Sequence, residues 1–174
     1  NPERFAALCL KIPHASNPAY IREIIRGLSE SEGRSITDSE MINVVLHAHN
    51  HPEKPFGEAI ARLLRSKPYL TKEEETLDLL IWYAVNGESS DDEEVDESNT
   101  VRESTDIGSL LQGGDRLHIR GINGVRGSAW GALNIVFSEI PSAEEKIINA
   151  ITFAVTNEPL VSIRCCIIES FCTI

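Results

Sequence analysis

The sequence lacks any apolar run long enough to cross a membrane. A spanning helix needs about 20 predominantly apolar residues, and no stretch of the chain approaches that length. It also lacks the pattern of an N-terminal secretory signal. Basic residues are few, with 16 against 27 acidic ones and a formal net charge of −11. Nucleic acids and anionic membrane surfaces both attract clustered basic residues, so we expect neither as a partner.

The sequence also lacks the residue patterns of common catalytic sites. No phosphate-binding loop of the form G-x-x-x-x-G-K-[ST] is present. The four cysteines are Cys9, Cys165, Cys166 and Cys172. Adjacent cysteines do not form an ordinary disulfide with each other, so buried free thiols in a reducing, cytoplasmic compartment fit the pattern best. We expect no catalytic residue, no metal and no cofactor in this chain.

One histidine cluster is the best candidate for a metal site. His47, His49 and His51 alternate along the chain, whereas zinc ligands on a helix are separated by three or four residues. Only His47 and His51 share a helical face, and Pro52 favours a helix end before it. A small helical metal protein or enzyme is therefore the least favoured of three hypotheses.

Helical periodicity runs along the chain, and no segment alternates as a strand does. The pattern predicts helices over 2–11, 19–30, 39–49, 56–66, 72–85, 106–111, 116–137, 142–156 and 159–173. The expected caps are Asn17, Thr37 or Asp38, Thr71 with Glu74, Ser142 with Glu145, and Asn157. The inward residues expected for the first two helices include Phe5, Leu8, Cys9, Ile12, Tyr20, Ile21, Ile24, Ile25 and Leu28. We therefore expect an all-α fold.

The most informative pattern is a segment that recurs after 38 residues. Val125-Arg126 and the apolar residues that follow align with Ile163-Arg164 and its own apolar continuation. An apolar–Arg pair that opens an apolar helix, repeated at a period near 40, is typical of stacked helical hairpins. We expect an α-solenoid of about four antiparallel hairpins of the HEAT or armadillo kind.

Glycines crowd the first copy of this repeat, at Gly121, Gly124, Gly127 and Gly131. Each interior glycine costs a helix about 0.5–1 kcal/mol relative to alanine, so they favour close packing of another helix. Arg126 and Arg164 are then expected to reach carbonyls or carboxylates of a neighbouring repeat. Contact between Arg126 and an anionic ligand is the alternative.

The domain organisation follows from the repeat and from the charge distribution. We expect one helical-repeat domain over 1–174, interrupted by an acidic insertion at 86–104. Residues 88–103 hold eight acids and one base, a net charge of −7. Such a run predicts a solvated insertion, with a docking loop for a basic partner as the alternative. Because the chain begins without Met and ends in an apolar run, we expect a longer parent protein.

Several short motifs along the chain resemble those of a known family. Pro159-Leu160-Val161-Ser162-Ile163-Arg164, after Asn157-Glu158, resembles the second helix of a HEAT repeat. The motifs PERFA from Pro2, NPAY from Asn17, LLIWYA from Leu79 and INGVRG from Ile122 occur in the order found in helical-repeat regions of large bacterial STAND-type NTPases similar to AVAST antiviral sensors. The resemblance implies a non-catalytic sensor or scaffold arm, with nucleotide hydrolysis elsewhere in the protein.

Three aromatic residues are candidates for contact with a protein partner: Trp82, Tyr83 and Trp130. Aromatic side chains dominate the energetics of protein interfaces. Their positions inside apolar helices nevertheless favour burial in the core. The leading hypothesis is a protein-binding scaffold, and a structural spacer or oligomerisation segment is the second.

Overall fold

The computed structural model describes residues 2–31, 36–87 and 124–172. In this part of the chain all regular secondary structure is helical, and it contains no strand. The all-α class expected from the sequence is therefore confirmed. The residues 88–103 of the acidic insertion, the helix expected at 106–111 and the start of the one expected at 116–137 lie outside the described residues.

The helices begin and end close to the positions expected from the periodicity. They are α1 (Pro2–Cys9), α2 (Pro18–Glu30), α3 (Asp38–His49), α4 (Gly57–Ser66), α5 (Glu74–Asn86), α7 (Val125–Glu139), α8 (Glu144–Asn157) and α9 (Val161–Cys172). Two short 3₁₀ helices, η1 (Pro68–Lys72) and η4 (Pro141–Ala143), precede α5 and α8. None of these helices has the length and apolar character that crossing a membrane requires.

Two of the expected helix caps are confirmed. The Asn17 side chain accepts a hydrogen bond from the backbone N–H of Ala19, and Pro18 follows it in the first turn of α2. Thr37 and Glu40 form a reciprocal capping box at the start of α3. The backbone N–H and the hydroxyl of Thr37 both donate to the Glu40 carboxylate, and these hydrogen bonds lower the pKa of Glu40.

The other expected caps are wrong. Thr71 belongs to η1, where its hydroxyl donates to the carbonyl of Pro68 at 2.7 Å, and α5 begins without a side-chain cap. Ser142 lies in η4, and α8 also begins without one. In both cases a proline starts a 3₁₀ turn immediately before the helix, and that turn takes up the residue expected to cap. Asn157 ends α8, where its side-chain amide donates to the carbonyl of Phe153.

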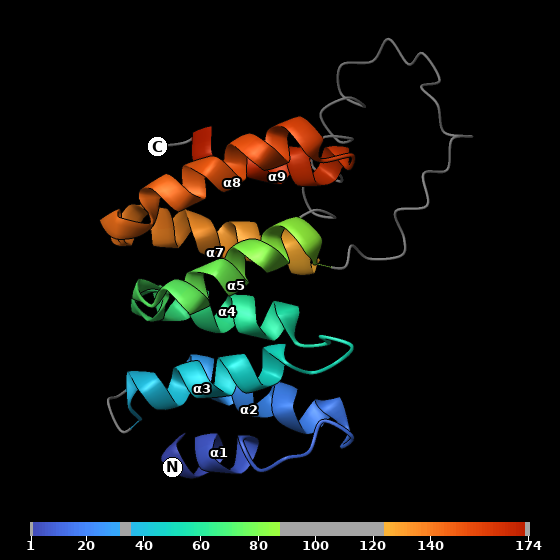
Figure 1. Ribbon diagram of the computed structural model, residues 1–174, viewed down its shortest axis with the longest axis vertical. Helices are drawn as coiled ribbons and strands as arrows, with labels where there is room; N and C mark the ends of the chain where they lie inside the picture. Colours follow the sequence, from blue (N-terminus) through green and yellow to red (C-terminus); the bar gives the residue numbers. More distant parts are fainter. Residues whose placement is uncertain (1, 32–35, 88–123, 173–174) are drawn as a thin grey trace, which may run out of the picture.

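The helices lie in two rows (Figure 1). In one row α1 packs against α3, α3 against α5, and α5 against α8. In the other row α2 packs against α4, α4 against α7, and α7 against α9. Across the rows α1 contacts α2, α3 contacts α4, α5 contacts α7, and α8 contacts α9. The stack therefore progresses along the chain from α1 at one end to α8 and α9 at the other.

The core lies between the two rows, and α7 is its most enclosed helix. Helix α7 packs against α4, α5, α9 and η1. Its buried residues are Gly127, Ala129, Trp130, Ala132, Leu133 and Val136. The largest side chains buried around it include Phe56, Ile60, Leu64, Leu80 and Tyr83. A helix enclosed on several sides needs apolar residues over most of its circumference, which accounts for the apolar run after Arg126.

Candidate functional site

Arg126, at the start of α7, connects three segments of the chain. Its guanidinium forms a salt bridge with Glu158 in the connection between α8 and α9. Its Nε donates to the carbonyl oxygen of Ala84 in α5, at 3.4 Å. The Arg126 side chain is 12% exposed and that of Glu158 is 1% exposed. Arg126 thus meets a carbonyl of α5 and a carboxylate of the α8–α9 connection, the kinds of group expected from the sequence.

The second copy of the motif differs from the first. Ile163 is buried in the core, whereas Arg164 is exposed to solvent. Within the part of the chain that the structure describes, Arg164 makes no buried ion pair like that of Arg126. The repeat therefore preserves the buried face of the helix but not the surroundings of its arginine.

Of the expected glycines, Gly127 is buried within α7, but Gly124 and Gly131 do not make the close helix packing expected of them. A Cβ on Gly124 would meet nothing within 4 Å, and one on Gly131 would meet only an arginine nitrogen at 3.9 Å. The close approach is made instead by Gly57, the first residue of α4. A Cβ there would lie 2.5 Å from Cγ1 of Val125 and 2.8 Å from the Tyr83 ring. The tight contact near α7 thus depends on a glycine of another helix.

The aromatic candidates separate into core and surface residues. Tyr83 and Trp130 are fully buried, so they offer no surface to a partner, and their candidacy as contact residues is withdrawn. Trp130 packs edge-on against Phe171, with ring centroids 6.2 Å apart. Trp82 is 36% exposed and is the one aromatic candidate that a partner can reach.

Trp82 belongs to a cluster where α3 ends beside α5. Lys54 donates from Nζ to the backbone oxygen of His49 at 2.9 Å, and the same Nζ lies 3.2 Å from His49 Nε2. It also lies 5.0 Å from the centre of the Trp82 ring, a cation–π contact. Lys54 adopts a left-handed backbone conformation with φ of 47°. These contacts with the end of α3 and with Trp82 offset the cost of that conformation.

Burial sets the protonation states inside this cluster. It lowers the pKa of His49, and the Lys54 ammonium lowers that pKa further. Burial also raises the pKa of Tyr83 to about 12. The Tyr83 hydroxyl lies 3.3 Å from His49 Nδ1. A neutral His49 therefore accepts from Lys54 through Nε2 and donates from Nδ1 to the tyrosine oxygen.

His14, His47 and His51 form a second cluster, and sequence reasoning missed His14. The ring of His14 packs against those of His47 and His51, at 4.5 and 5.3 Å between centroids. Each ring reaches a backbone oxygen through Nε2: His14 to His47 at 3.0 Å, His47 to Ile12 at 3.2 Å, and His51 to His14 at 2.9 Å. These bonds join the α1–α2 connection to α3. Among the described residues no group of three or more histidines, cysteines or carboxylates is placed to hold a metal ion.

The structure describes the side chains of three of the four cysteines. Cys9 and Cys166 are buried thiols, and Cys165 is a half-buried thiol. Burial raises the pKa of the Cys9 thiol to about 11. A thiol with so high a pKa has little reactive thiolate at neutral pH, so Cys9 acts as an apolar residue of the core.

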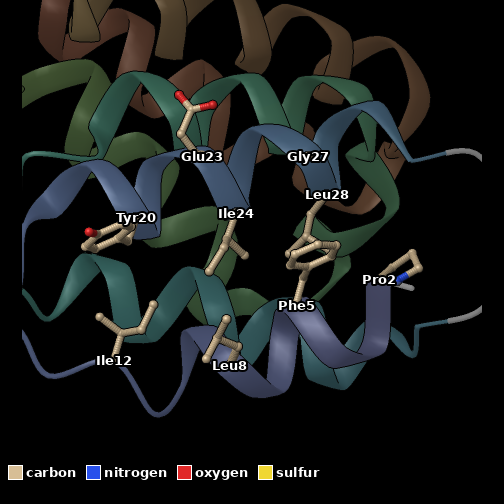
Figure 2. Close-up of a pocket in the computed structure, with 9 residues that line it drawn as sticks. All are labelled: Pro2, Phe5, Leu8, Ile12, Tyr20, Glu23, Ile24, Gly27 and Leu28. Carbon is tan, nitrogen blue, oxygen red and sulfur yellow. The ribbon is translucent and has the colours of Figure 1, made fainter.

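An apolar groove of about 490 Å³ lies between α1 and α2 (Figure 2). Its lining residues are Pro2, Phe5, Leu8, Ile12, Tyr20, Glu23, Ile24, Gly27 and Leu28. In Figure 2 the side chains of Leu8 and Ile24 point toward one another across the groove. Phe5, Leu8 and Tyr20 are 53%, 50% and 64% exposed. The expectation that these three side chains face the core is therefore wrong.

Comparisons with known protein families, with curated proteins and with solved structures find no match to this chain.

Proposed function

We propose that the chain is a HEAT-like α-solenoid that binds a protein and has no catalytic activity of its own. The pairing of α1 with α2, α3 with α4, α5 with α7, and α8 with α9 supports four stacked helix pairs. The repeated motif opens α7 and α9, which occupy the same row in consecutive pairs. In an α-solenoid the sequence repeat and the structural repeat coincide.

The apolar groove between α1 and α2 is the observation that carries the binding role. The faces of these helices that turn toward the rest of the stack bury Ala6, Cys9, Ile21 and Ile25. A second apolar face holds the groove, so each helix is apolar on two sides. Contiguous exposed apolar side chains mark interaction sites. Further along the stack such faces are covered by helices, and the occupant that continues this packing is an amphipathic helix of a partner.

We further propose that this scaffold is the sensor arm of a cytoplasmic bacterial antiviral NTPase. The HEAT-like segment at 157–164 and the ordered motifs that include Trp82 and Arg126 support this assignment. This assignment predicts a phosphate-binding loop elsewhere in the parent protein. The sequence of the full-length gene tests it: a parent protein without a nucleotide-binding motif would refute the assignment to that family.

Peptide phage display tests the helix-binding role. We expect the chain to enrich helix-forming peptides with apolar residues at positions i, i+3, i+4 and i+7, at roughly micromolar affinity. Leu8→Glu places a carboxylate in the groove and should weaken binding at least about tenfold. Phe153→Glu is the matched control, because Phe153 is a similarly exposed apolar residue on α8. Enrichment of no helical peptide, or equal loss in both variants, would contradict the proposal.

The spacer or oligomerisation hypothesis keeps one observation in its favour. Large apolar side chains are also exposed on α8 and α9, at Ile148, Phe153, Val155 and Ile168. Apolar surface at both ends of the stack would support association between copies. Sedimentation velocity across a range of concentrations separates the two roles, since a scaffold that binds through α1 and α2 stays monomeric without its partner.

A further inference from the structure

A second hollow, of about 410 Å³, lies between α2 and α4. Three arginines, two glutamates and four uncharged residues line it: Arg22, Arg26, Arg62, Glu23, Glu58, Ser29, Pro55, Ala59 and Val125. Pro55 and Val125 also line a neighbouring hollow of about 240 Å³. Because they share these residues, the two hollows adjoin, and we call them together the arginine groove.

The arginines of this groove keep hydrogen-bonding capacity for a ligand. Arg26 pairs with Glu23 and Arg62 pairs with Glu58, both at 2.6 Å, and all four side chains are exposed to solvent. Exposed ion pairs within one helix contribute little to stability, so a ligand displaces them at small cost. Arg22 donates to the carbonyl of Pro55 at 3.2 Å. A guanidinium has five N–H donors, so one such partner does not saturate it.

The charge of the two helix rows differs in a way that favours this groove for an acidic ligand. In one row α3, α5 and α8 carry net charges of −2, −3 and −1, and α1 carries none. In the row that holds the arginines, α4 carries +1 and α2, α7 and α9 are each neutral. An anionic segment is repelled by the first row and directed toward the second.

The neighbouring hollow adds an aromatic anchor and a further cation. Trp82, Lys54 and Asn86 line it beside one carboxylate, that of Glu53. The Lys54 ammonium already lies over the Trp82 ring. A ligand that follows the groove from α2 to α5 therefore meets guanidinium groups first and then a tryptophan beside an ammonium. Arginine and tryptophan are the residue types that most often dominate protein interfaces.

We propose that the arginine groove binds an extended acidic peptide segment of a partner protein. Its carboxylates pair with Arg22, Arg26 and Arg62 in the two-point geometry that guanidinium groups favour, and its flanking residues contact Trp82. The inference rests on the protein-binding role proposed above but uses a different surface from the apolar groove of α1 and α2. A short segment responds to the local field, because charges beyond about 10 Å are screened at physiological salt.

Fluorescence anisotropy with the full chain tests this inference. The probe is a labelled peptide of roughly twelve residues rich in Asp and Glu with one tryptophan, and its control has Asn and Gln in their place. We expect only the acidic peptide to bind, and its affinity to fall at least about tenfold between about 50 and about 300 mM salt. The double variant Arg22→Gln/Arg62→Gln should lose roughly tenfold or more in affinity.

The matched control variant is Lys11→Gln/Lys72→Gln, which also removes two exposed positive charges, both from outside the groove. We expect it to bind within about twofold of the unmodified chain, since screened charges elsewhere contribute little. Equal loss in both double variants would mean attraction by overall charge and would overturn the inference. So would equal binding of the Asn/Gln peptide.

Other occupants give distinct results. One alternative occupant is the acidic segment 88–103 of the chain itself. In that case a variant with Asn and Gln in place of the acids of 88–103 would bind the peptide, and the unmodified chain would not. This result would overturn the proposal that a partner's peptide occupies the groove. Tighter, arginine-dependent binding of a single-stranded oligonucleotide would overturn it as well.

The variant Leu8→Glu distinguishes the arginine groove from the apolar groove of α1 and α2, because it alters only the apolar groove. If the chain binds helical peptides but not the acidic peptide, only this inference is refuted. If it binds the acidic peptide but no helical peptide, only the helix-binding role of the apolar groove is refuted.

Discussion

Helices α7 and α9 open with the same apolar–Arg motif and lie in the same row, yet their arginines have opposite surroundings. Arg126 is enclosed between Glu158 and the carbonyl of Ala84. Arg164 is exposed. The motif thus specifies which helix face is buried, and Ile163 follows it. What the arginine contacts depends on the next connection, because Glu158 comes from the link between α8 and α9.

The difference also has an energetic meaning. Glu158 accepts from the backbone N–H of Leu160 at 3.0 Å as well as from Arg126, so one carboxylate both orders the entry to α9 and neutralises a buried guanidinium. A buried ion pair gains little over an apolar pair, but removal of one partner leaves an uncompensated charge. The α7 motif is thus tied to neighbouring segments through its arginine, whereas the arginine of the α9 motif is exposed.

Glu158→Ala should have the largest effect. It removes the Glu158 carboxylate that pairs with Arg126 and that accepts from the Leu160 N–H. We expect a loss of about 3–5 kcal/mol in the free energy of unfolding. Urea denaturation followed by circular dichroism measures it. Adding Arg126→Met should restore part of the loss, because no buried charge then remains. Glu58→Ala, which breaks an exposed pair with Arg62, should cost no more than about 0.5 kcal/mol.

Gly57→Ala should have the next largest effect, because it tests the close contact at the start of α7. Its new Cβ would meet Val125 Cγ1 at 2.5 Å, and we expect overpacking to destabilise the chain by about 1–3 kcal/mol. Gly131→Ala is the control inside α7, where the nearest atom lies at 3.9 Å. There the better helix propensity of alanine should stabilise the chain by about 0.5–1 kcal/mol. Thermal denaturation of both variants checks the opposite signs.

His49→Gln should change the pH dependence of stability through the contacts that His49 makes where α3 ends beside α5. The pKa of His49 is lowered by burial and then by Lys54, so the unfolded chain binds its proton more readily than the folded chain. The stability that this group contributes is present above its ordinary pKa of 6.5 and is lost as the pH falls through the lowered pKa. Unfolding measured from about pH 7.5 to about pH 5.5 should show a shallower loss in the variant. An unchanged slope would contradict the assignment.

The helices could be predicted from the sequence because periodicity and local capping residues determine them. Asn17 and Thr37 act within a few residues along the chain, and both predictions are confirmed. Thr71 and Ser142 fit the same pattern but follow prolines that start 3₁₀ turns, so the local pattern is ambiguous there. The start of a helix after a proline depends on whether a 3₁₀ turn or a capped α-helical turn forms there.

The surface could not be predicted from the same pattern. Trp82 and Tyr83 are neighbours in a largely apolar helix, and nothing local says that one is exposed and the other buried. Phe5 and Tyr20 look like core residues because their helices are apolar on two sides. His14 contacts His47 and His51 across more than thirty residues of sequence. Each of these outcomes depends on how distant helices pack, which neither periodicity nor spacing contains.

Arg164→Met should have the smallest effect and decides whether the two motifs differ as described. An exposed arginine without a buried partner contributes little, so the free energy of unfolding should change by no more than about 0.5 kcal/mol. Arg126→Met removes the partner of a buried carboxylate and should cost about 3–5 kcal/mol in the same measurement. A loss for Arg164→Met close to that for Arg126→Met would mean that both arginines tie helices together. The repeat would then extend to the arginine's contacts as well as to the buried face of the helix.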